Sequence, residues 1–311
     1  MNEKTKQDYL KLAQYFLQCR LIDDQIPLTP KNIRQALTAC AKEYRPAYWR
    51  RLRCALVTQQ RETGFSKQAE VLKAVRNPIT SADAPKEIKV LRKTKQRRCK
   101  SVNKEQHFML KNHLINKQDF ATVAAIETVR ILGCRPAEIL EIKLMGGNQV
   151  FIPGAKKTEN GLRGLDRIVI VSNQDYATLS YSRGGLFDEV HHNKHNARAD
   201  KAMQRIQHRL AHACKTLWPK QKHRISLYSY RHQIGSDLKT SGMSRQEVAA
   251  IMGHQSVDSV DVYGNKHHSS RTLSIKASTD SVTHVRKTQQ KNTDFIATKK
   301  KVMGMNRDKI N

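Results

Sequence analysis

Apolar residues recur at helical spacing through much of the chain, and before residue 80 they predict four short helices. The first covers about 9–17. The second begins at Thr29, a capping hydroxyl, with Pro30 at the first helical position. The third and fourth cover about 46–64 and 66–75. Since this region lacks the alternation of a strand, we expect a small all-helical module.

The second half of the chain predicts a mixture of helices and short strands. Apolar runs at 150–152 and 168–171 are typical of strands, and the glycine-rich stretch 154–164 between them predicts a hairpin tip. From Gly264 the chain is polar, which predicts a mostly irregular tail with room for one short helix that docks on a partner. Helical patterns cover about 104–116, 119–132, 197–218, 226–240, 244–252 and 256–263. We therefore expect a mostly α fold with a small β-hairpin or sheet (α+β).

Charge adds a partner to this picture. The 311 residues include 57 Lys and Arg against 27 Asp and Glu, a net charge of +30. Such an excess opposes compaction and indicates a polyanionic partner, nucleic acid first. Basic residues are densest at 86–104, where Glu87 is the one acidic residue. Because a block of like charges repels itself, we expect a linker between two domains there.

Several classes of protein are disfavoured by the same sequence. It has no apolar run of 18 residues, the length that a membrane-spanning helix needs, and its start does not resemble a signal peptide. The six cysteines form no CxxC pair, which argues against a zinc ribbon and against a disulfide scaffold. We expect a reducing compartment, the cytoplasm.

A candidate anion site lies where one predicted helix ends and the next begins. Gly133 ends the first helix, and Pro136 lies in the first turn of the second. Arg135 is thus placed at a helix N-terminus, where the positive end of the dipole favours an anion, with Glu138 one turn further on. A surface Arg–Glu pair is the alternative interpretation.

Two further segments carry candidate chemistry. Tyr228 and Arg231 are three residues apart and share a face of a predicted helix. His254 follows Gly253 at the junction of two later helices, and Tyr263 lies nine residues beyond His254. Together these segments supply a guanidinium, an imidazole and phenols.

The ordered set of these residues resembles the tyrosine recombinases, also called phage-type integrases. The family pattern is Gly-x-Arg-x-x-Glu, a Lys on a β-hairpin, His-x-x-Arg, Leu-Gly-His, and a Tyr nine residues after that His. The matching residues here are Gly133, Arg135 and Glu138; Lys156 or Lys157; Tyr228 and Arg231; Met252, Gly253 and His254; and Tyr263. Tyr228 departs from the pattern, because a phenol can donate to a phosphate oxygen but does not readily shuttle protons near pH 7.

The resemblance implies a mechanism without metal, cofactor or ATP. Tyr263 would attack a DNA phosphodiester, form a 3′-phosphotyrosyl link and release a 5′-hydroxyl. Arg135 and Arg231 would bind the phosphate, and His254 would hydrogen-bond and help take the phenol proton. The leaving oxygen would be protonated by Lys157, which directly precedes a threonine at the turn as in some phage members; Lys156 is the alternative.

The resemblance also implies an organisation and partners. We expect a helical core-binding domain at 1–85, the basic linker at 86–104, a catalytic domain at 105–265, and a basic tail at 266–311 that docks on a neighbouring protomer. Double-stranded DNA would be the partner, bound by a homotetramer on paired sites. The sequence leaves open the target site, the direction of recombination and any need for accessory DNA-bending proteins.

Other interpretations fit part of the same sequence. A type IB topoisomerase-like nicking and religating enzyme would use the same chemistry, and a catalytically silent DNA-binding protein would explain the charge but not Tyr263. An RNA-binding protein is disfavoured by the low aromatic content of 6%. A group of histidines at 191, 192 and 195 is interpreted as a polar loop rather than a metal site. His208 and His212 lack the glutamate of an HExxH motif.

Overall fold

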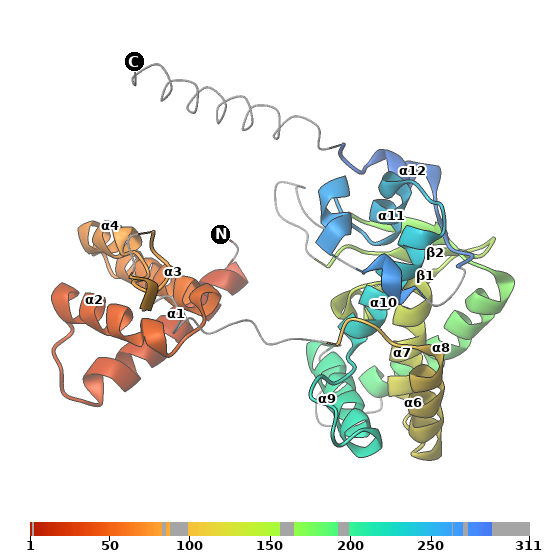
Figure 1. Cartoon of the computed structure of the whole chain (residues 1–311), viewed down its shortest axis with the longest axis horizontal. Coiled ribbons are helices and arrows are strands. Elements are labelled where there is room, and N and C mark those ends of the chain that lie inside the picture. The colour runs from red at the N-terminus through yellow and green to blue at the C-terminus, as the bar shows by residue number, and fades with distance from the viewer. Residues whose placement is uncertain are drawn as a thin grey trace. The chain divides into compact units, whose positions relative to one another are not determined.

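The chain forms two compact units, residues Met1–Arg97 and Arg98–Asn311, in a computed structural model (Figure 1). Each unit has its own hydrophobic core. The residues that the structure describes are 1, 3–82, 85–87, 99–155, 165–191, 199–262, 264–269 and 273–287. Most of the expected linker and the tip of the expected hairpin thus lie outside the described residues.

The first unit contains the four expected helices. Thr29 caps the second of them, since its hydroxyl accepts a hydrogen bond from the Asn32 amide at 3.2 Å. In the core, the Trp49 indole donates to the Leu37 carbonyl at 2.7 Å, which satisfies a polar group that the apolar cluster would otherwise leave unpaired. The helices are α1 (Glu3–Leu17), which runs on into the π-helical turn η1 (Gln18–Ile22), α2 (Pro30–Ala39), the 3₁₀ turn η2 (Cys40–Lys42), α3 (Pro46–Glu62) and α4 (Ser66–Ala74).

The second unit is built around one buried helix, α7 (Phe120–Leu132). It packs against α6, α8, α9 and α10, so that its apolar residues are enclosed on most sides. The other helices are α6 (Lys104–Asn116), η3 (Pro136–Glu141), α8 (Asn173–His191), α9 (Ala199–Leu217), α10 (Leu227–Thr240), α11 (Arg245–Ile251), η4 (Val257–Val262), η5 (Lys266–His268) and α12 (Thr279–Thr283). The segments η3, η4 and η5 are 3₁₀ turns, so the expected helix at 256–263 is a 3₁₀ helix where it is described.

A small antiparallel sheet lies beside these helices, in the order β1 (Lys143–Leu144), β2 (Gln149–Ile152), β3 (Arg167–Ile170) and β4 (Lys276–Ala277). The expected hairpin is the β2–β3 pair, with Val150 opposite Val169. Inward residues of both strands are buried, as alternation of side chains across a strand requires. The expected α+β class, mostly helical with a small sheet, is confirmed.

Part of the expected tail belongs to this unit. Residues 276–277 form the edge strand β4, and Ile275 and Val285 are buried in the core. Ser281 in α12 accepts a hydrogen bond from the Ile168 amide at 2.9 Å. The compact unit therefore continues past residue 265, to about 286. The remainder of the tail, 270–272 and 288–311, lies outside the described residues.

The helix α8 was not expected from the sequence. Few of its apolar residues follow a helical stripe, and those that are buried, Leu179 and Leu186, are accompanied by exposed aromatic residues such as Tyr181. Its packing against α7 is close: a β-carbon at Gly185 would lie 3.1 Å from the Phe120 carbonyl oxygen. Tertiary contact with α7, rather than an amphipathic pattern, thus stabilises this helix.

No helix in the described part of the chain has the length and apolar character needed to span a membrane.

Truncation of a side chain in the middle of α7 tests this architecture. Ile126 is fully buried, so Ile126→Ala leaves a cavity, and we expect it to lower the unfolding free energy of the second unit by about 2–5 kcal/mol. Urea denaturation followed by the fluorescence of Trp218, which packs on this core, measures the change. Tyr181→Ala on the exposed face of α8 is the control, expected within about 0.5 kcal/mol of the wild type. Equal losses in both variants would contradict the proposed core.

Candidate active site

Arg135 lies at the junction predicted from the sequence. α7 ends at Gly133, whose φ of 61° is left-handed, and Arg135 caps the 3₁₀ turn η3, in which Pro136 is the first residue. Glu138 closes this turn, since one of its carboxylate oxygens accepts from the Arg135 amide at 2.8 Å and the other from Arg135 Nη1 at 2.7 Å. The side chain of Arg135 is 12% exposed, so its guanidinium reaches the edge of the site.

Arg231 lies on α10 and is fully buried. Its Nη1 donates to the carbonyl of Gly133 at the end of α7, and its Nη2 donates to the carbonyl of Met252 just after α11. One guanidinium thus joins three helices. The C-terminal ends of helices leave carbonyl groups without intrahelical partners and carry partial negative charge, so both bonds compensate the buried positive charge.

His254 follows α11 and is 4% exposed. The preceding Gly253 has a left-handed backbone, with φ of 62°. The His254 amide donates a hydrogen bond to the Ala249 carbonyl in α11 at 2.8 Å. Its ring Nε2 lies 3.2 Å from Arg231 Nη2. Because a guanidinium can only donate, Nε2 is the acceptor in this contact and carries no proton.

Burial, followed by the positive charges of Arg231, Arg135 and Arg167, lowers the pKa of His254 to about 3. The imidazole is therefore neutral at pH 7. For Glu138, burial alone would raise the pKa, but the guanidiniums of Arg167 and Arg135 outweigh it and lower that pKa to about 2. The site thus holds one buried carboxylate, one neutral imidazole and several guanidiniums.

The end of α11 gathers the arginines. Its last residue and the two that follow present three successive carbonyl groups, and each accepts a hydrogen bond from a different guanidinium. The pairs are Ile251 O with Arg167 Nε at 2.9 Å, Met252 O with Arg231 Nη2 at 2.6 Å, and Gly253 O with Arg135 Nη2 at 3.0 Å. The structure therefore brings together the predicted residues Arg135, Arg231 and His254.

Arg167 was not singled out by the sequence. It is the first residue of β3, directly before the apolar run, and its side chain is buried. Its Nη2 donates to Glu138 at 2.9 Å. A charged residue at the start of a short strand is commonly solvent-exposed, so only the tertiary contact with Glu138 distinguishes Arg167.

Tyr228 is placed differently from the other candidates. It lies in the first turn of α10 and is 38% exposed, whereas Arg231, three residues later, is fully buried. Among the described residues, the hydrogen bonds that hold the cluster together do not include Tyr228.

The expected nucleophile Tyr263 and the hairpin lysines Lys156 and Lys157 lie outside the described residues. The described residues next to them contact Glu138 on one side and α10, the helix of Arg231, on the other. Before the lysines, the Ala155 amide donates to Glu138 at 3.4 Å. After the tyrosine, Gly264 accepts from Lys239 of α10 at 3.0 Å.

The backbone at Gly264 passes very close to the backbone of α10. Its φ is 72°, and a β-carbon there would lie 2.3 Å from the carbonyl carbon of Gly235 in α10. The next residue, Asn265, donates its amide to Ser236 at 2.9 Å. The segment that follows position 263 is thus fixed to the same helix that carries Arg231.

A second residue missed by the sequence analysis is Gln233, which is buried on α10. It accepts from the amide of Val102, at the end of the expected linker, at 3.1 Å, and donates to the carbonyl of His268 at 2.6 Å. Gln233 therefore ties the start of this unit to the segment after position 263. A polar residue on the buried face of a predicted helix is the signal that could have identified it.

The described histidines of the two groups belong to α8 and α9. His191 ends α8 and stacks on Phe187, with ring centroids 4.1 Å apart, while residues 192 and 195 lie outside the described residues. His208 and His212 line a hollow of about 680 Å³ between α6 and α9. Within the described ranges, no three His, Cys, Asp or Glu side chains gather as metal ligands.

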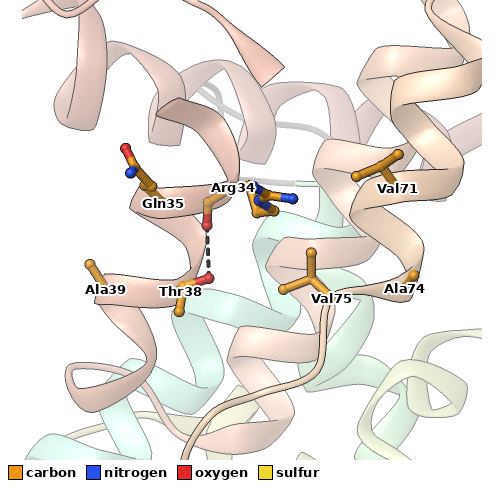
Figure 2. A pocket seen from close by; sticks show the side chains of 7 residues that line it. All are labelled: Arg34, Gln35, Thr38, Ala39, Val71, Ala74 and Val75. Carbon is orange, nitrogen blue, oxygen red and sulfur yellow. Dashed lines mark hydrogen bonds between the residues drawn. The ribbon is translucent and has the colours of Figure 1, made fainter. Parts of the chain in front are cut away.

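The first unit has a hollow of its own, of about 710 Å³, between α2 and α4 (Figure 2). Its walls are mainly apolar, and Thr38 donates to the Arg34 carbonyl at 2.8 Å on one side. Val71 and Val75 line the other side. It contains none of the motif residues.

The low pKa of His254 makes the stability of the second unit depend on pH. Since the folded-state pKa lies below the ordinary value of about 6.5, the folded state binds the proton less well, and stability is lost as pH falls from 6.5 toward 3. Glu138 adds a loss of the same sign, but only below about pH 4.5.

We expect the unfolding free energy to fall by up to about 1.4 kcal/mol per pH unit between pH 6.5 and 4.5, and this slope to be reduced in His254→Gln. Urea denaturation at a series of pH values measures it. Equal slopes for the two proteins would show that His254 is not a neutral buried imidazole.

Comparison with known proteins places the fold. No family model matches the chain, and no curated protein matches it. Several solved structures, however, match the chain. A lambda integrase dimer bound to a COC′ core site matches at 15% identity and a TM-score of 0.54, over 86% of this chain and 73% of that one.

Two further structures agree. A lambda integrase tetramer bound to a Holliday junction has 13% identity and a TM-score of 0.54, over 85% of this chain and 72% of that one. The Tn1549 transposon integrase in complex with a circular intermediate DNA has 11% identity and a TM-score of 0.52, over 85% and 90%. At such identities the likeness concerns the fold. The chain has the fold of the tyrosine recombinases, which is the family its motifs resemble.

Proposed function

We propose that this protein is a site-specific DNA recombinase that cuts and rejoins strands through a 3′-phosphotyrosyl link to Tyr263. The observation that carries the proposal is the convergence of Arg135, Arg231 and His254, which come from three separate segments, at one place in the fold. The segment that precedes the hairpin lysines contacts Glu138 beside the cluster, and the segment that follows Tyr263 contacts α10, the helix that carries Arg231.

The donors of Arg135 suit a phosphate ligand. A guanidinium has five N–H groups, and in the described part of the chain Arg135 uses one on Glu138 and one on Gly253. The others are available for the non-bridging oxygens, on which negative charge accumulates in the transition state. A bound phosphate would also raise the pKa of His254, because its negative charge offsets the three guanidiniums.

The reaction conserves the energy of the phosphodiester bond. The Tyr263 oxygen forms a bond to phosphorus as the bond to the 5′-oxygen breaks, and the phenol proton passes to His254 or to water. A hairpin lysine, Lys157 with Lys156 as the alternative, gives its proton to the leaving 5′-oxygen. Attack by a 5′-hydroxyl of a second strand reverses these steps, and Tyr228 adds a hydrogen bond to the phosphate.

Both units contribute to DNA binding in this proposal. The helical unit, near 1–85, acts as the core-binding domain. Three exposed arginines lie at the start of α3: Arg45, which precedes the helix as its N-cap, and Arg50 and Arg51 within it. The unit that begins near 105 is the catalytic domain. The net charge of +30 favours a duplex as the ligand, and by analogy with the lambda integrase tetramer we propose four protomers on paired sites.

Loss of the phenol oxygen tests this function directly. Tyr263→Phe should bind duplex DNA as the wild type does and form no covalent complex, because it has no nucleophile. A nicked suicide substrate, analysed in denaturing gels, measures the adduct. A denaturant-resistant adduct in Tyr263→Phe, or none in the wild type, would contradict the proposal. Sequencing the DNA trapped by the wild type would identify the target site.

The two hairpin lysines are distinguished by the leaving group. Lys157→Ala should slow cleavage of a normal 5′-oxygen bond but scarcely affect a 5′-thio bond, because a thiolate leaves without a proton. Lys156→Ala serves as the matched control and should show no difference between the two substrates. The opposite pattern would assign the role to Lys156.

A further inference from the structure

Arg167 is a buried arginine next to the candidate site. Its side chain is about 1% exposed, and its donors point to two different elements. Nη2 donates to Glu138 of η3 at 2.9 Å, and Nε donates to the carbonyl of Ile251 at the end of α11 at 2.9 Å. Arg167 therefore fixes the distance between η3 and the end of α11.

Glu138 is the group through which Arg167 acts. One of its oxygens accepts from Arg167 Nη2 and from the Arg135 amide, and the other accepts from Arg135 Nη1. The carboxylate is fully buried and so needs its positive partners in place. If Arg167 is removed, the oxygen that it held is free to draw the Arg135 guanidinium into a two-pronged contact. That would turn Arg135 away from the phosphate position.

Arg167 also packs against the backbone of Gly253. A β-carbon at that glycine would lie 2.5 Å from Arg167 Nη1, so the guanidinium occupies the space that a side chain at 253 would need. Nη1 itself has no hydrogen-bond partner among the described residues. The Gly253 carbonyl accepts from Arg135 at 3.0 Å. Arg167 thus borders both groups that bind Arg135.

We propose that Arg167 is a positioning residue that keeps the Arg135 guanidinium aimed at the scissile phosphate by holding Glu138 and the end of α11. The inference rests on the proposed function. Arg167 does not touch DNA in this proposal, because its side chain is enclosed by protein. Arginine suits this position better than lysine, since its donors are spaced apart in a planar fork and can serve a carboxylate on one element and a carbonyl on another, whereas the donors of lysine lie on one nitrogen.

The experiment compares two scissile linkages, a phosphodiester and a neutral methylphosphonate, in full-length protein. The methylphosphonate lacks one charged oxygen, so its cleavage depends less on Arg135. We expect Arg167→Met to slow formation of the covalent complex by about 10²-fold on the phosphodiester, the scale of a misplaced group, and at least ten-fold less on the methylphosphonate. Arg135→Ala should show the same pattern.

A double variant and a matched control complete the design. Arg167→Met combined with Arg135→Ala should cleave no more slowly than Arg135→Ala alone, since both substitutions remove one effect. The control is Arg205→Met: Arg205 also shares its carboxylate, Glu189, with a second arginine, but on α8 and α9. It should slow both linkages alike, by less than about three-fold.

Several outcomes would overturn the inference. Equal slowing of both linkages by Arg167→Met would indicate a loss of folded protein only, and additive effects in the double variant would indicate a separate role. If Arg167→Met is insoluble, Arg167→Lys is used, with a smaller loss of the same selectivity expected; if neither variant folds, the role is in folding.

An inactive wild type would contradict the proposed function instead. The coupling would then be measured by urea denaturation, where the effects of Arg167→Met and Arg135→Ala on unfolding should not add. Additive effects there would overturn the inference.

Discussion

The arrangement of this site depends on how buried guanidiniums are neutralised. Three successive carbonyl groups at the end of α11 each accept from one arginine, and the Glu138 carboxylate accepts from two of the three. An ion buried without such partners would cost several kcal/mol. Helix ends supply partial negative charge at fixed positions, so they hold the guanidiniums in place without neutralising them completely. Burial and, after it, the remaining positive potential lower the pKa of His254, and the same potential suits the cluster to an anion.

Close approach of backbones is the second requirement. Gly133, Gly253 and Gly264 are all left-handed, and a β-carbon at any of them would lie within 2.7 Å of a neighbouring atom. These neighbours belong to Ile234, Arg167 and Gly235. These glycines, two of them motif residues, therefore act by leaving room for a close contact: they allow the end of α7, the end of α11 and the segment after position 263 to meet α10 and β3.

Local sequence signals predicted much of this. The cap at Thr29, the left-handed end of α7 at Gly133 and the proline that opens η3 are local features, and each is found where the pattern placed it. Arg135, Arg231 and His254 were selected by their order and spacing and are brought together by the fold. By contrast, α8 carries too weak a pattern, and the two-residue strands β1 and β4 are too short for any periodicity to indicate them.

The sequence by itself determined most of the helical segments, the hairpin strands, the excess of positive charge and the ordered motif residues, because each of these is encoded within a few neighbouring positions. Only the tertiary structure decided which charges are buried and what neutralises them. Arg167 lies 29 residues from Glu138 and 84 from Ile251, and Gln233 lies 131 from Val102. Such partners are chosen by the packing of separate elements, and no local pattern records them. The physical reason is that desolvation acts on whatever the fold encloses, whereas propensity and capping act along the chain.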